Sequence, residues 1–403
     1  MTIEAPSIDD VENLYHILAY FAEKKPSDLA VKDSHYSLSY AELKQLVDDC
    51  ATSMLSNDLG QGSRVICWSD PNAQFLVTFL AAASIGCLWL GFNPKYRHFE
   101  MNYLLEDFQP HMLISIPSVL GEDAQAELDM ALQSADPNIK TGVWPRGKPF
   151  PFSKENDAPA ELEKVRQSVV ALDPCAIVYT SGTTGKPKGA ILTHQSVTTS
   201  ARLNAGWLGD CLERTLCNFP INHVACLNNL SMNTLVVGGA IYFQPRFDPG
   251  QVLDAVTRER ITCLSMVPTM LAAVVAFPEF ERTDFSSIEL LYWGGAAVPL
   301  HLAELVQRKE IRCGVIYGQS ETTGIVTRGI AENGTTCEDA STTVGTPLDG
   351  IEWRLADPNT GFPGIRGRNL AFTPCNPLFL LSILPVFSQA FKWASFWPIY
   401  DVP

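Results

Sequence analysis

The chain contains 403 residues with a formal net charge of −15, and 46% of its residues are hydrophobic. This length allows a large core and roughly two or three domains, and the apolar content excludes a mainly disordered chain. The acidic surplus disfavours electrostatic capture of nucleic acid, so we expect no nucleic-acid partner. An anionic substrate remains possible where lysines are concentrated locally.

The eleven cysteines are scattered singly along the chain. They form no C-x-x-C pair and several lie in apolar runs, which is typical of buried thiols rather than of a disulfide framework or metal cluster. The first residues, MTIEAPSIDDVEN, lack the basic and apolar segments of a secretory signal. The last residues, Asp401 to Pro403, are not a peroxisomal address. We therefore expect an intracellular, cytoplasmic protein.

The first part of the chain alternates between helical and strand patterns. Residues 39–54 repeat apolar side chains at helical spacing, and Ser39 with Glu42 forms a capping box at their start. Further helices are predicted at 72–83 and 101–105, and strands at 64–68, 86–92 and 112–116. This alternation predicts a mostly parallel, doubly wound α/β sheet. The polar stretch 145–163 has no periodicity and is predicted to be a linker or surface excursion.

The glycine-rich run at residues 179–190, YTSGTTGKPKGA, is the most informative segment. It follows an apolar run at 175–179 that is predicted to be a buried strand, and residues 190–195 after it lead into a segment with helical character. Glycines expose backbone N–H groups and tolerate positive φ, while the hydroxyls and lysines add donors and positive charge. A strand, such a loop and a helix predict a polyphosphate nest. A flexible surface loop of the same composition is the alternative.

This run does not fit the P-loop of ordinary NTPases. That motif requires a glycine separated by four residues from a Gly-Lys pair, and serine or threonine after the pair. Thr180 occupies the position of the first glycine, and Pro187 follows Lys186. The Walker pattern therefore fails at both ends.

After this loop the α/β alternation resumes. Helices are predicted at 252–260, 268–277 and 299–308, and strands at 261–267, 288–293 and 311–317. The last two of these strands lead into Gly294-Gly-Ala and Tyr317-Gly-Gln-Ser-Glu. Open α/β sheets bind ligands at the carboxyl ends of their strands, so both segments are candidate binding sites. The carboxylate of Glu321, with hydroxyls beside it, suits Mg²⁺.

The run at 179–190 closely resembles the phosphate-loop signature of the adenylate-forming superfamily, which includes acyl- and aryl-CoA synthetases, peptide-synthetase adenylation domains and luciferases. Other segments follow in the family's order over about residues 10–366: N-P-K-Y-R-H-F-E at 93–100, P-I-N-H at 220–223, G-G-A at 294–296, Y-G-Q-S-E at 317–321 and V-G-T-P at 344–347. The resemblance implies an AMP-binding adenylation domain over residues 1–366. Its fold is the large N-terminal domain of the acyl-CoA synthetase type, with two doubly wound α/β subdomains and a smaller β-barrel-like subdomain.

The resemblance also implies the residues of an ATP site. The implied catalytic residues are Lys188, His223 and Glu321, and the implied magnesium ligands are Thr184 and Glu321. In this interpretation Tyr317 packs on adenine, and Ser320 replaces the family's threonine at the α-phosphate. A polar strand-to-loop turn is the alternative for that segment. The implied ATP-binding residues are Thr180, Ser181, Gly182, Thr183, Thr184, Gly185, Lys186, Lys188, Gly295, Ala296, Ala297, Tyr317, Gly318 and Ser320.

The acid pocket implied by the resemblance consists of His223, Val224, Cys226, Trp293 and Gly294. There His223 would steer the carboxylate, although a lone histidine is also a common structural residue. The indole of Trp293 would narrow the acyl tunnel, with a core tryptophan as the alternative. Amino-acid-activating members place an aspartate in this segment. The apolar neighbours of His223 instead favour an acid without an α-amino group, either fatty or aromatic.

The reaction implied by the resemblance has two steps. A carboxylic acid attacks the α-phosphate of MgATP, giving an acyl-adenylate and pyrophosphate, and a thiol, usually coenzyme A, then displaces AMP. ATP, Mg²⁺ and coenzyme A are therefore the expected cofactors and co-substrates. The competing interpretation is a catalytically impaired paralogue that only binds nucleotide or acyl ligand.

The end of the sequence departs from the family. After Gly367 it lacks the Y-x-T-G-D motif, the hinge and the small C-terminal domain with its adenylation lysine. Residues 367–403 are therefore predicted to be an aberrant apolar tail outside the family fold. Within them, residues 376–400 are long and apolar enough for a membrane anchor, although Pro385 and Pro398 interrupt them. A truncated or misread gene product, a membrane anchor and an evolved single-domain protein are the alternatives.

Overall fold

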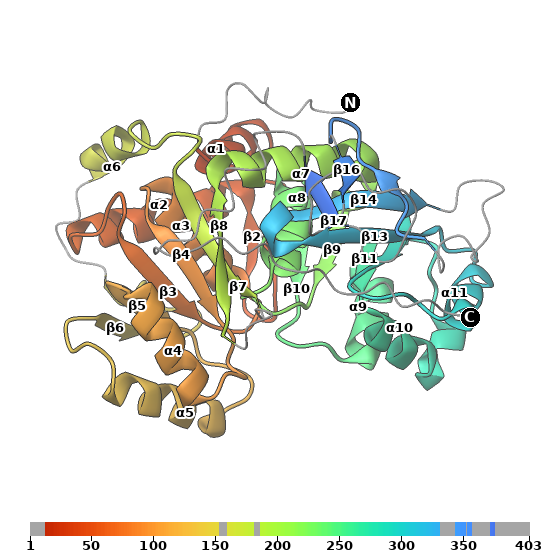
Figure 1. Ribbon diagram of the computed structural model, residues 1–403, viewed down its shortest axis with the longest axis horizontal. Coiled ribbons are helices and arrows are strands. Elements are labelled where there is room, and N and C mark those ends of the chain that lie inside the picture. Colours follow the sequence, from red (N-terminus) through yellow and green to blue (C-terminus); the bar gives the residue numbers. More distant parts are fainter. Residues whose placement is uncertain are drawn as a thin grey trace.

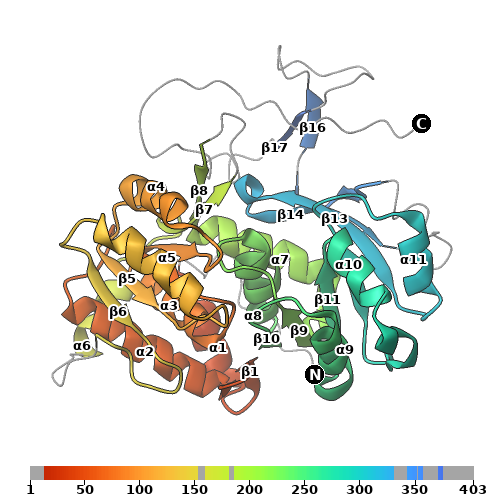
Figure 2. The same ribbon diagram turned by 90° about the horizontal axis from the view of Figure 1, so that it is seen from below.

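In a computed structural model of the protein, residues 13–152, 159–180, 186–330, 343–351, 353–356 and 371–374 are described. They form two α/β lobes that lie side by side (Figure 1 and Figure 2). Each lobe has one large, mostly parallel sheet with apolar cores on both faces. The predicted α/β class with doubly wound sheets is thereby confirmed.

The sheet of the first lobe has the strand order β6–β5–β3–β4–β7–β8. Its strands are β3 (Arg64–Trp68), β4 (Leu88–Phe92), β5 (Met112–Ser115), β6 (Lys140–Val143), β7 (Pro174–Thr180) and β8 (Lys188–Thr193). All neighbouring pairs are parallel except β7 and β8. The edge hairpin β7–β8 faces the second lobe in Figure 1.

Helices cover both faces of this first sheet. They are α1 (Tyr15–Lys24), α2 (Tyr40–Ser56) and α3 (Ala73–Ser84) on one face, and α4 (His98–Phe108) and α5 (Glu122–Gln133) on the other. Successive residues of a strand point to opposite faces. Val65 and Cys67 accordingly join the core with α2 and α3, whereas Ile66 and Trp68 join the core with α4 and α5.

The sheet of the second lobe has the strand order β15–β14–β13–β12–β11–β9–β10–β1–β2. Its strands are β1 (Leu29–Lys32), β2 (Ser37–Ser39), β9 (Arg214–Cys217), β10 (Ala240–Phe243), β11 (Cys263–Met266), β12 (Leu290–Trp293), β13 (Cys313–Gln319), β14 (Gly324–Ile330) and β15 (Thr346–Pro347). Six neighbouring strands of this sheet, in the order β1–β10–β9–β11–β12–β13, are parallel to one another. The chain thus starts this sheet, builds the first lobe and then returns to complete the sheet.

Two groups of helices cover the second sheet. One contains α7 (His194–Leu208), the π-helix η3 (Ala225–Met232) and α8 (Asn233–Val236), and the other contains α9 (Pro249–Glu259), α10 (Pro268–Val275) and α11 (Leu300–Gln307). Short 3-10 turns are η2 (Gly209–Glu213), η4 (Pro278–Arg282) and η5 (Ser320–Thr322). Tyr292 joins the core of the first group, and its neighbour Trp293 joins the core of the second.

Several predicted boundaries agree with the structure. Strand β3 covers the predicted residues, and helix α2 starts directly after its predicted cap. The Ser39 hydroxyl oxygen accepts a hydrogen bond from the Glu42 backbone N–H at 3.3 Å, and the Glu42 carboxylate accepts one from the Ser39 backbone N–H at 2.8 Å. The capping box therefore satisfies two backbone donors, as its spacing predicts.

The predicted order of strand, loop and helix omits one strand, because β8 lies between the phosphate loop and the helix. Strand β8 comes first and pairs with β7 as an antiparallel hairpin, and helix α7 begins only at His194. The Thr193 hydroxyl oxygen accepts from the Ser196 backbone N–H at 3.1 Å and so caps the helix. The apolar run at 190–192 is too short to distinguish strand from helix by periodicity, and pairing with β7 decides in favour of strand.

The prediction of a linker or surface excursion at 145–163 is also partly wrong, because helix α6 (Pro159–Arg166) begins within these residues. The buried Arg166 ties α6 to the first lobe: its guanidinium lies 2.8 Å from an Asp48 carboxylate oxygen and 3.4 Å above the Tyr15 ring. This helix has only two turns, so its stability comes from tertiary contacts rather than from an apolar repeat.

The first residue of α7, His194, predicts a pH-dependent stability. Its Nδ1 accepts from the Leu14 backbone N–H at 3.1 Å, and burial lowers the imidazole pKa from its usual 6.5 to about 3. The folded state therefore disfavours the charged ring. Its contribution to stability is complete above about pH 6.5 and is lost as the pH falls towards 3, at up to about 1.4 kcal/mol per pH unit. Urea unfolding between about pH 7.5 and 4.5 measures this slope.

The variant His194→Gln should flatten that pH dependence because it removes the titrating ring. The matched control is His35→Gln, which changes an exposed histidine. It should keep the wild-type slope. Equal slopes in all three proteins would contradict the assignment of acid sensitivity to His194.

The last described strands, β16 (Trp353–Ala356) and β17 (Ala371–Pro374), pair as an antiparallel ribbon. The ribbon crosses the predicted domain boundary at residue 366. Residues 375–403, including the predicted membrane anchor at 376–400, lie outside the described residues. Among the residues that are described, no helix has the length and apolar character needed to cross a bilayer.

Candidate active site

The stem of the phosphate loop meets the second lobe at Glu321. Thr180 ends β7, and its hydroxyl lies 3.3 Å from a Glu321 carboxylate oxygen and 3.4 Å from the Lys188 carbonyl oxygen. Glu321 belongs to η5, which directly follows β13. Thr180 and Glu321 are 141 positions apart in the sequence. The β7–β8 hairpin therefore brings the predicted phosphate loop to the predicted magnesium carboxylate, at the junction between the lobes in Figure 2.

Part of the predicted phosphate loop lies outside the described residues: Ser181, Gly182, Thr183, Thr184 and Gly185. The lysines that follow, Lys186 and Lys188, are both exposed. Lys188 pairs with Thr180 across the hairpin. Two positive charges and one carboxylate thus gather at the stem, and this combination suits a polyphosphate with a bound Mg²⁺.

The predicted adenine segments lie at one edge of the second sheet. Strands β12 and β13 are parallel neighbours, with Trp293 paired to Val315, so the residues after both strands emerge at the same edge. Ser320 is buried. The other nucleotide-binding residues predicted at this edge are partly or fully exposed: Gly295, Ala296, Ala297, Tyr317 and Gly318. Small residues beside an accessible aromatic ring allow a flat base to approach the backbone.

His223 precedes the π-helix η3. Its Nδ1 accepts from the Ala225 backbone N–H at 3.0 Å, so the neutral ring carries its proton on Nε2. The side chain is exposed by surface area, yet enough protein surrounds it for desolvation to lower the imidazole pKa. His223 is therefore neutral at pH 7, and Nε2 is a hydrogen-bond donor for a carboxylate.

The other residues predicted for the acid pocket are buried. Val224 and Cys226 point into the core, and the Cys226 sulfur lies 3.5 Å from the Cys217 sulfur. Trp293 has no exposed surface and belongs to the core that contains α9, α10 and α11. This placement corresponds to the core alternative for Trp293. Gly294 is buried as well, and a Cβ there would lie 2.5 Å from Ile316 Cδ1.

The π-helix η3 also holds the segment that follows Glu321. The Asn228 side-chain amide donates to the Thr323 carbonyl oxygen at 2.6 Å and to the Ser200 hydroxyl oxygen at 3.0 Å. Thr323 has a φ of +58° and Gly324 a φ of +118°, so the backbone turns sharply here. Asn228 was not predicted as a site residue. Its only sequence signal is its position five residues after His223.

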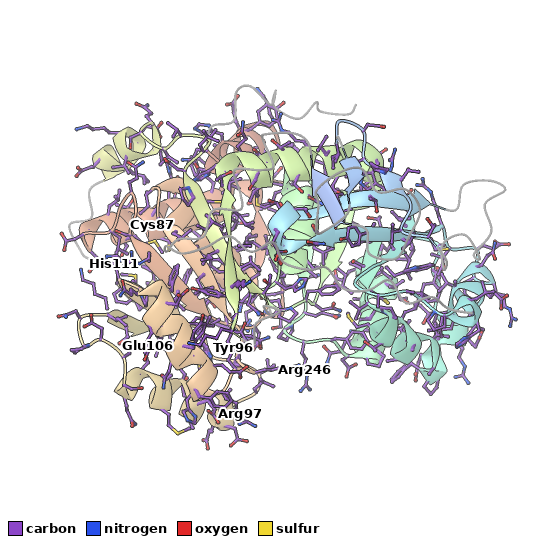
Figure 3. The ribbon with its side chains drawn as sticks, in the orientation of Figure 1. Cys87, Tyr96, Arg97, Glu106, His111 and Arg246 are labelled. Atoms are coloured by element: carbon purple, nitrogen blue, oxygen red, sulfur yellow. The ribbon has the colours of Figure 1, made fainter. Side chains whose placement is uncertain are left out.

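A second contact links the His223 segment to the first lobe. The Asn222 side-chain amide donates to the Tyr96 hydroxyl oxygen at 2.6 Å. Tyr96 comes from the N-P-K-Y segment before α4, and Figure 3 places it on the side of the first lobe that faces the second. Through this hydrogen bond the N-P-K-Y segment connects the first lobe to the second, next to His223.

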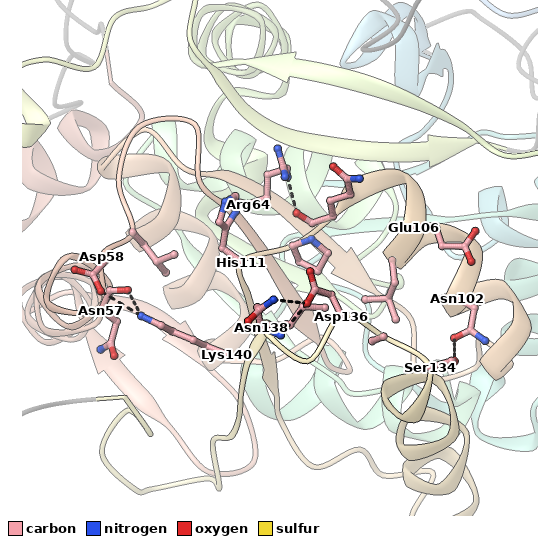
Figure 4. A pocket seen from close by; sticks show the side chains of 16 residues that line it. Asn57, Asp58, Arg64, Asn102, Glu106, His111, Ser134, Asp136, Asn138 and Lys140 are labelled. Atoms are coloured by element: carbon pink, nitrogen blue, oxygen red, sulfur yellow. Dashed lines mark hydrogen bonds and ion pairs between the residues drawn. The ribbon is translucent and has the colours of Figure 1, made fainter.

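A hollow of about 670 Å³ lies at the opposite edge of the first sheet, before the start of its strands (Figure 4). The Arg64 guanidinium donates to the Gln109 carbonyl oxygen at 2.7 Å, and the Lys140 ammonium donates to the Asn57 carbonyl oxygen at 2.5 Å. Gln109 and Asn57 are the C-caps of α4 and α2. Arg64 and Lys140 therefore stabilise the C-terminal ends of α4 and α2. Because these two cations already bind backbone carbonyl groups, the β7–β8 hairpin is the better candidate for the active site.

A sequence profile of the family described as AMP-binding enzyme matches residues 18–368. The chain belongs to the AMP-binding enzyme family. The match confirms the family inferred from the phosphate loop. It includes every segment of the candidate site, from Thr180 to Glu321.

Relatives within the AMP-binding enzyme family are acid–CoA ligases by name. Feruloyl-CoA synthase from Amycolatopsis sp. is 32% identical over 304 residues, which cover 74% of this chain and 58% of that protein. Indoleacetate–CoA ligase from Aromatoleum aromaticum is 30% identical over 305 residues, which cover 74% of this chain and 58% of that protein. The chain thus spans less than two thirds of the length of these curated relatives.

Solved structures confirm the fold of the AMP-binding enzyme family. The N-terminal domain of FACL13 from Mycobacterium tuberculosis superposes with a TM-score of 0.75 at 22% identity, covering 90% of this chain and 89% of that one. O-succinylbenzoate coenzyme A synthetase from Bacillus subtilis, solved with ATP and magnesium ion, has a TM-score of 0.70 at 21% identity and covers 89% of this chain and 70% of that one.

The residues present fit the ATP and Mg²⁺ that the AMP-binding enzyme family implies. Glu321 is half-buried and contacts the Thr180 hydroxyl, with the exposed Lys188 across the hairpin. The described residues hold no group of three or more metal-ligating side chains. Magnesium at nucleotide sites usually takes one or two carboxylates, with phosphates and water completing its shell. Glu321 can supply the protein's share of such a shell.

Proposed function

We propose that this chain adenylates a carboxylic acid that has no α-amino group, and that transfer of the acyl group to coenzyme A follows. A carboxylate oxygen of the acid forms a bond to the α-phosphorus of ATP. The bond from that phosphorus to the bridging oxygen breaks, and pyrophosphate leaves with the electron pair. The observation that carries the proposal is the 3.3 Å contact between Thr180 and Glu321, because it joins the phosphate-loop stem to the carboxylate that is proposed to bind Mg²⁺.

The protein groups act through charge and position rather than as nucleophiles. A bound Mg²⁺ supplies charge neutralisation at the phosphate oxygens. Glu321 would hold that ion at the junction of the lobes, and Lys188 adds positive charge where negative charge develops in the transition state. His223 donates from Nε2 to the acid and orients its other oxygen towards phosphorus.

The identity of the neighbours of His223 supports an acid without a charged amino group. Val224 and Cys226 are apolar, and neither offers a carboxylate for a substrate ammonium. The names of the two relatives, which refer to feruloyl and indoleacetate groups, support an aromatic acid. A fatty acid is the other member of the proposed class.

ATP–pyrophosphate exchange with a panel of aromatic, fatty and amino acids tests the proposal. We expect exchange with at least one aromatic or fatty acid and none with amino acids. Lys188→Ala should lower exchange about 10-fold or more, since it removes one charge from the phosphate site. Lys164→Ala changes an exposed lysine at the end of α6 and should leave exchange unchanged. MgATP binding without exchange for any acid would instead indicate a pocket that binds nucleotide without turnover.

A further inference from the structure

We propose that helix α4 positions the nucleotide-binding hairpin through Tyr103 and Asp107, and that the Tyr103 ring orients Lys186 towards ATP. This inference rests on the proposed function, because it assumes that ATP binds at the hairpin. It concerns residues of the first lobe, whereas Glu321 belongs to the second.

Both strands of the hairpin are tied to one face of α4. The Tyr179 hydroxyl near the end of β7 donates to an Asp107 carboxylate oxygen at 2.5 Å, and the Tyr103 hydroxyl donates to the Pro187 carbonyl oxygen at 3.1 Å. Pro187 directly precedes β8. Tyr103 and Asp107 are four residues apart and so lie above one another on the helix surface. A single rigid helix therefore determines where both ends of the phosphate loop stand.

Tyr103 has a second contact, with Lys186. The Lys186 ammonium nitrogen lies 5.7 Å from the centre of the Tyr103 ring. A cation over an aromatic face is attracted by the electron-rich ring. Lys186 is otherwise an exposed side chain with four rotatable bonds, so the ring restricts the positions that its charge samples. Tyr103 thereby orients a positive charge at the mouth of the loop.

Helix α4 is itself well anchored. Its inner face places Met101, Leu104 and Phe108 in a core that also contains Ile177 of β7. At its start, the Glu127 carboxylate of α5 accepts from the His98 backbone N–H at 2.7 Å. The helix is therefore held against the same sheet that carries the hairpin, and it can serve as a fixed support.

Two features of Tyr179 favour its contact with α4. Burial and the neighbouring Asp107 carboxylate raise the pKa of the Tyr179 phenol, so the hydroxyl stays protonated and donates. Gly189 pairs with Tyr179 across the hairpin, and a Cβ at Gly189 would lie 2.4 Å from Ile177 Cδ1. Because Gly189 has no side chain, Ile177 and Tyr179 can occupy the space beside it. The hairpin is thus shaped to present the Tyr179 hydroxyl to Asp107.

The test measures ATP and acid dependence of pyrophosphate exchange separately, together with MgATP binding by calorimetry. Tyr103→Leu removes both the hydroxyl and the ring, and should raise KM and Kd for MgATP about 3- to 10-fold while KM for the acid stays unchanged. Tyr103→Phe keeps the ring below Lys186 and should recover part of that loss. Phe99→Leu is the matched control, because it exchanges an exposed aromatic residue of the same helix for leucine. It should behave as wild type.

The outcomes separate this inference from the proposed function. If wild type binds MgATP but exchanges with no acid, the proposed function fails, and the ratio of Kd values between wild type and Tyr103→Leu still decides the inference. An unchanged Kd for MgATP in Tyr103→Leu would overturn it. The inference would also be overturned if Phe99→Leu raised the Kd for MgATP as much as Tyr103→Leu does. An equally large rise in the KM for the acid in Tyr103→Leu would overturn it too. Absence of MgATP binding by wild type would overturn both. Circular dichroism confirms that each variant is folded.

Discussion

Replacing Glu321 by glutamine is expected to lower ATP–pyrophosphate exchange about 100-fold or more. Glutamine has nearly the same size and can still accept the hydrogen bond from Thr180. It has no negative charge, however, and is a much weaker ligand for Mg²⁺. The exchange reaction of Glu321→Gln, measured across a range of Mg²⁺ concentrations, gives the effect. Exchange should recover partly as Mg²⁺ increases.

The control for this variant is Glu304→Gln, which removes a charge from an exposed position of α11. It should retain wild-type exchange and the wild-type Mg²⁺ requirement. Thermal unfolding of both variants should stay close to that of wild type, because neither change disturbs the core. Full exchange by Glu321→Gln would remove Glu321 from the proposed metal site.

The second large effect is expected at Gly324. Its φ of +118° is a conformation that L-residues rarely adopt, and an added Cβ would lie 2.0 Å from the Asn229 side-chain oxygen in η3. Gly324→Ala therefore combines backbone strain with overpacking and should lower the free energy of unfolding by about 2–4 kcal/mol. Because Glu321 lies three residues earlier, exchange should fall as well. Urea denaturation and the exchange assay measure the two effects.

Gly206→Ala provides a matched substitution. Gly206 lies inside α7, and an added Cβ there meets no heavy atom within 4 Å. Alanine in a helix should be neutral or stabilise the protein by about 0.5–1 kcal/mol. If Gly324→Ala unfolds at the same urea concentration as Gly206→Ala, the proposed tight contact between η3 and the turn after η5 is wrong.

Local patterns predicted much of the fold, because the residues that decide these elements are close in sequence. The start of α2, for example, is determined by the capping box of Ser39 and Glu42, two residues that are only three positions apart. The family order of motifs likewise located Glu321 and the segment at 294–297. The carboxyl ends of β12 and β13 follow from a general property of parallel sheets.

Other features depend on contacts that no local pattern records. The π-helix η3 is held by Asn228 against Thr323, a residue 95 positions later. The contact between Tyr103 and Pro187 joins residues 84 positions apart. Trp293 could not be assigned from its sequence context, because both faces of β12 are covered and alternation alone does not identify an open face. These residues are recognised only when the lobes are assembled.

The arrangement of the second sheet has a consequence for synthesis of the protein. Strand β1 pairs with β10, and Val31 lies opposite Ile241 in the register. On the ribosome, where translation proceeds at about 5–20 residues per second, β1 emerges long before its partner exists. The first lobe is made during this interval. Of the described strands, β1 therefore has the longest delay before its parallel partner is made, while its other edge can pair with the nearby β2 at once. The contact between Thr180 and Glu321 likewise forms only after the second lobe has been made.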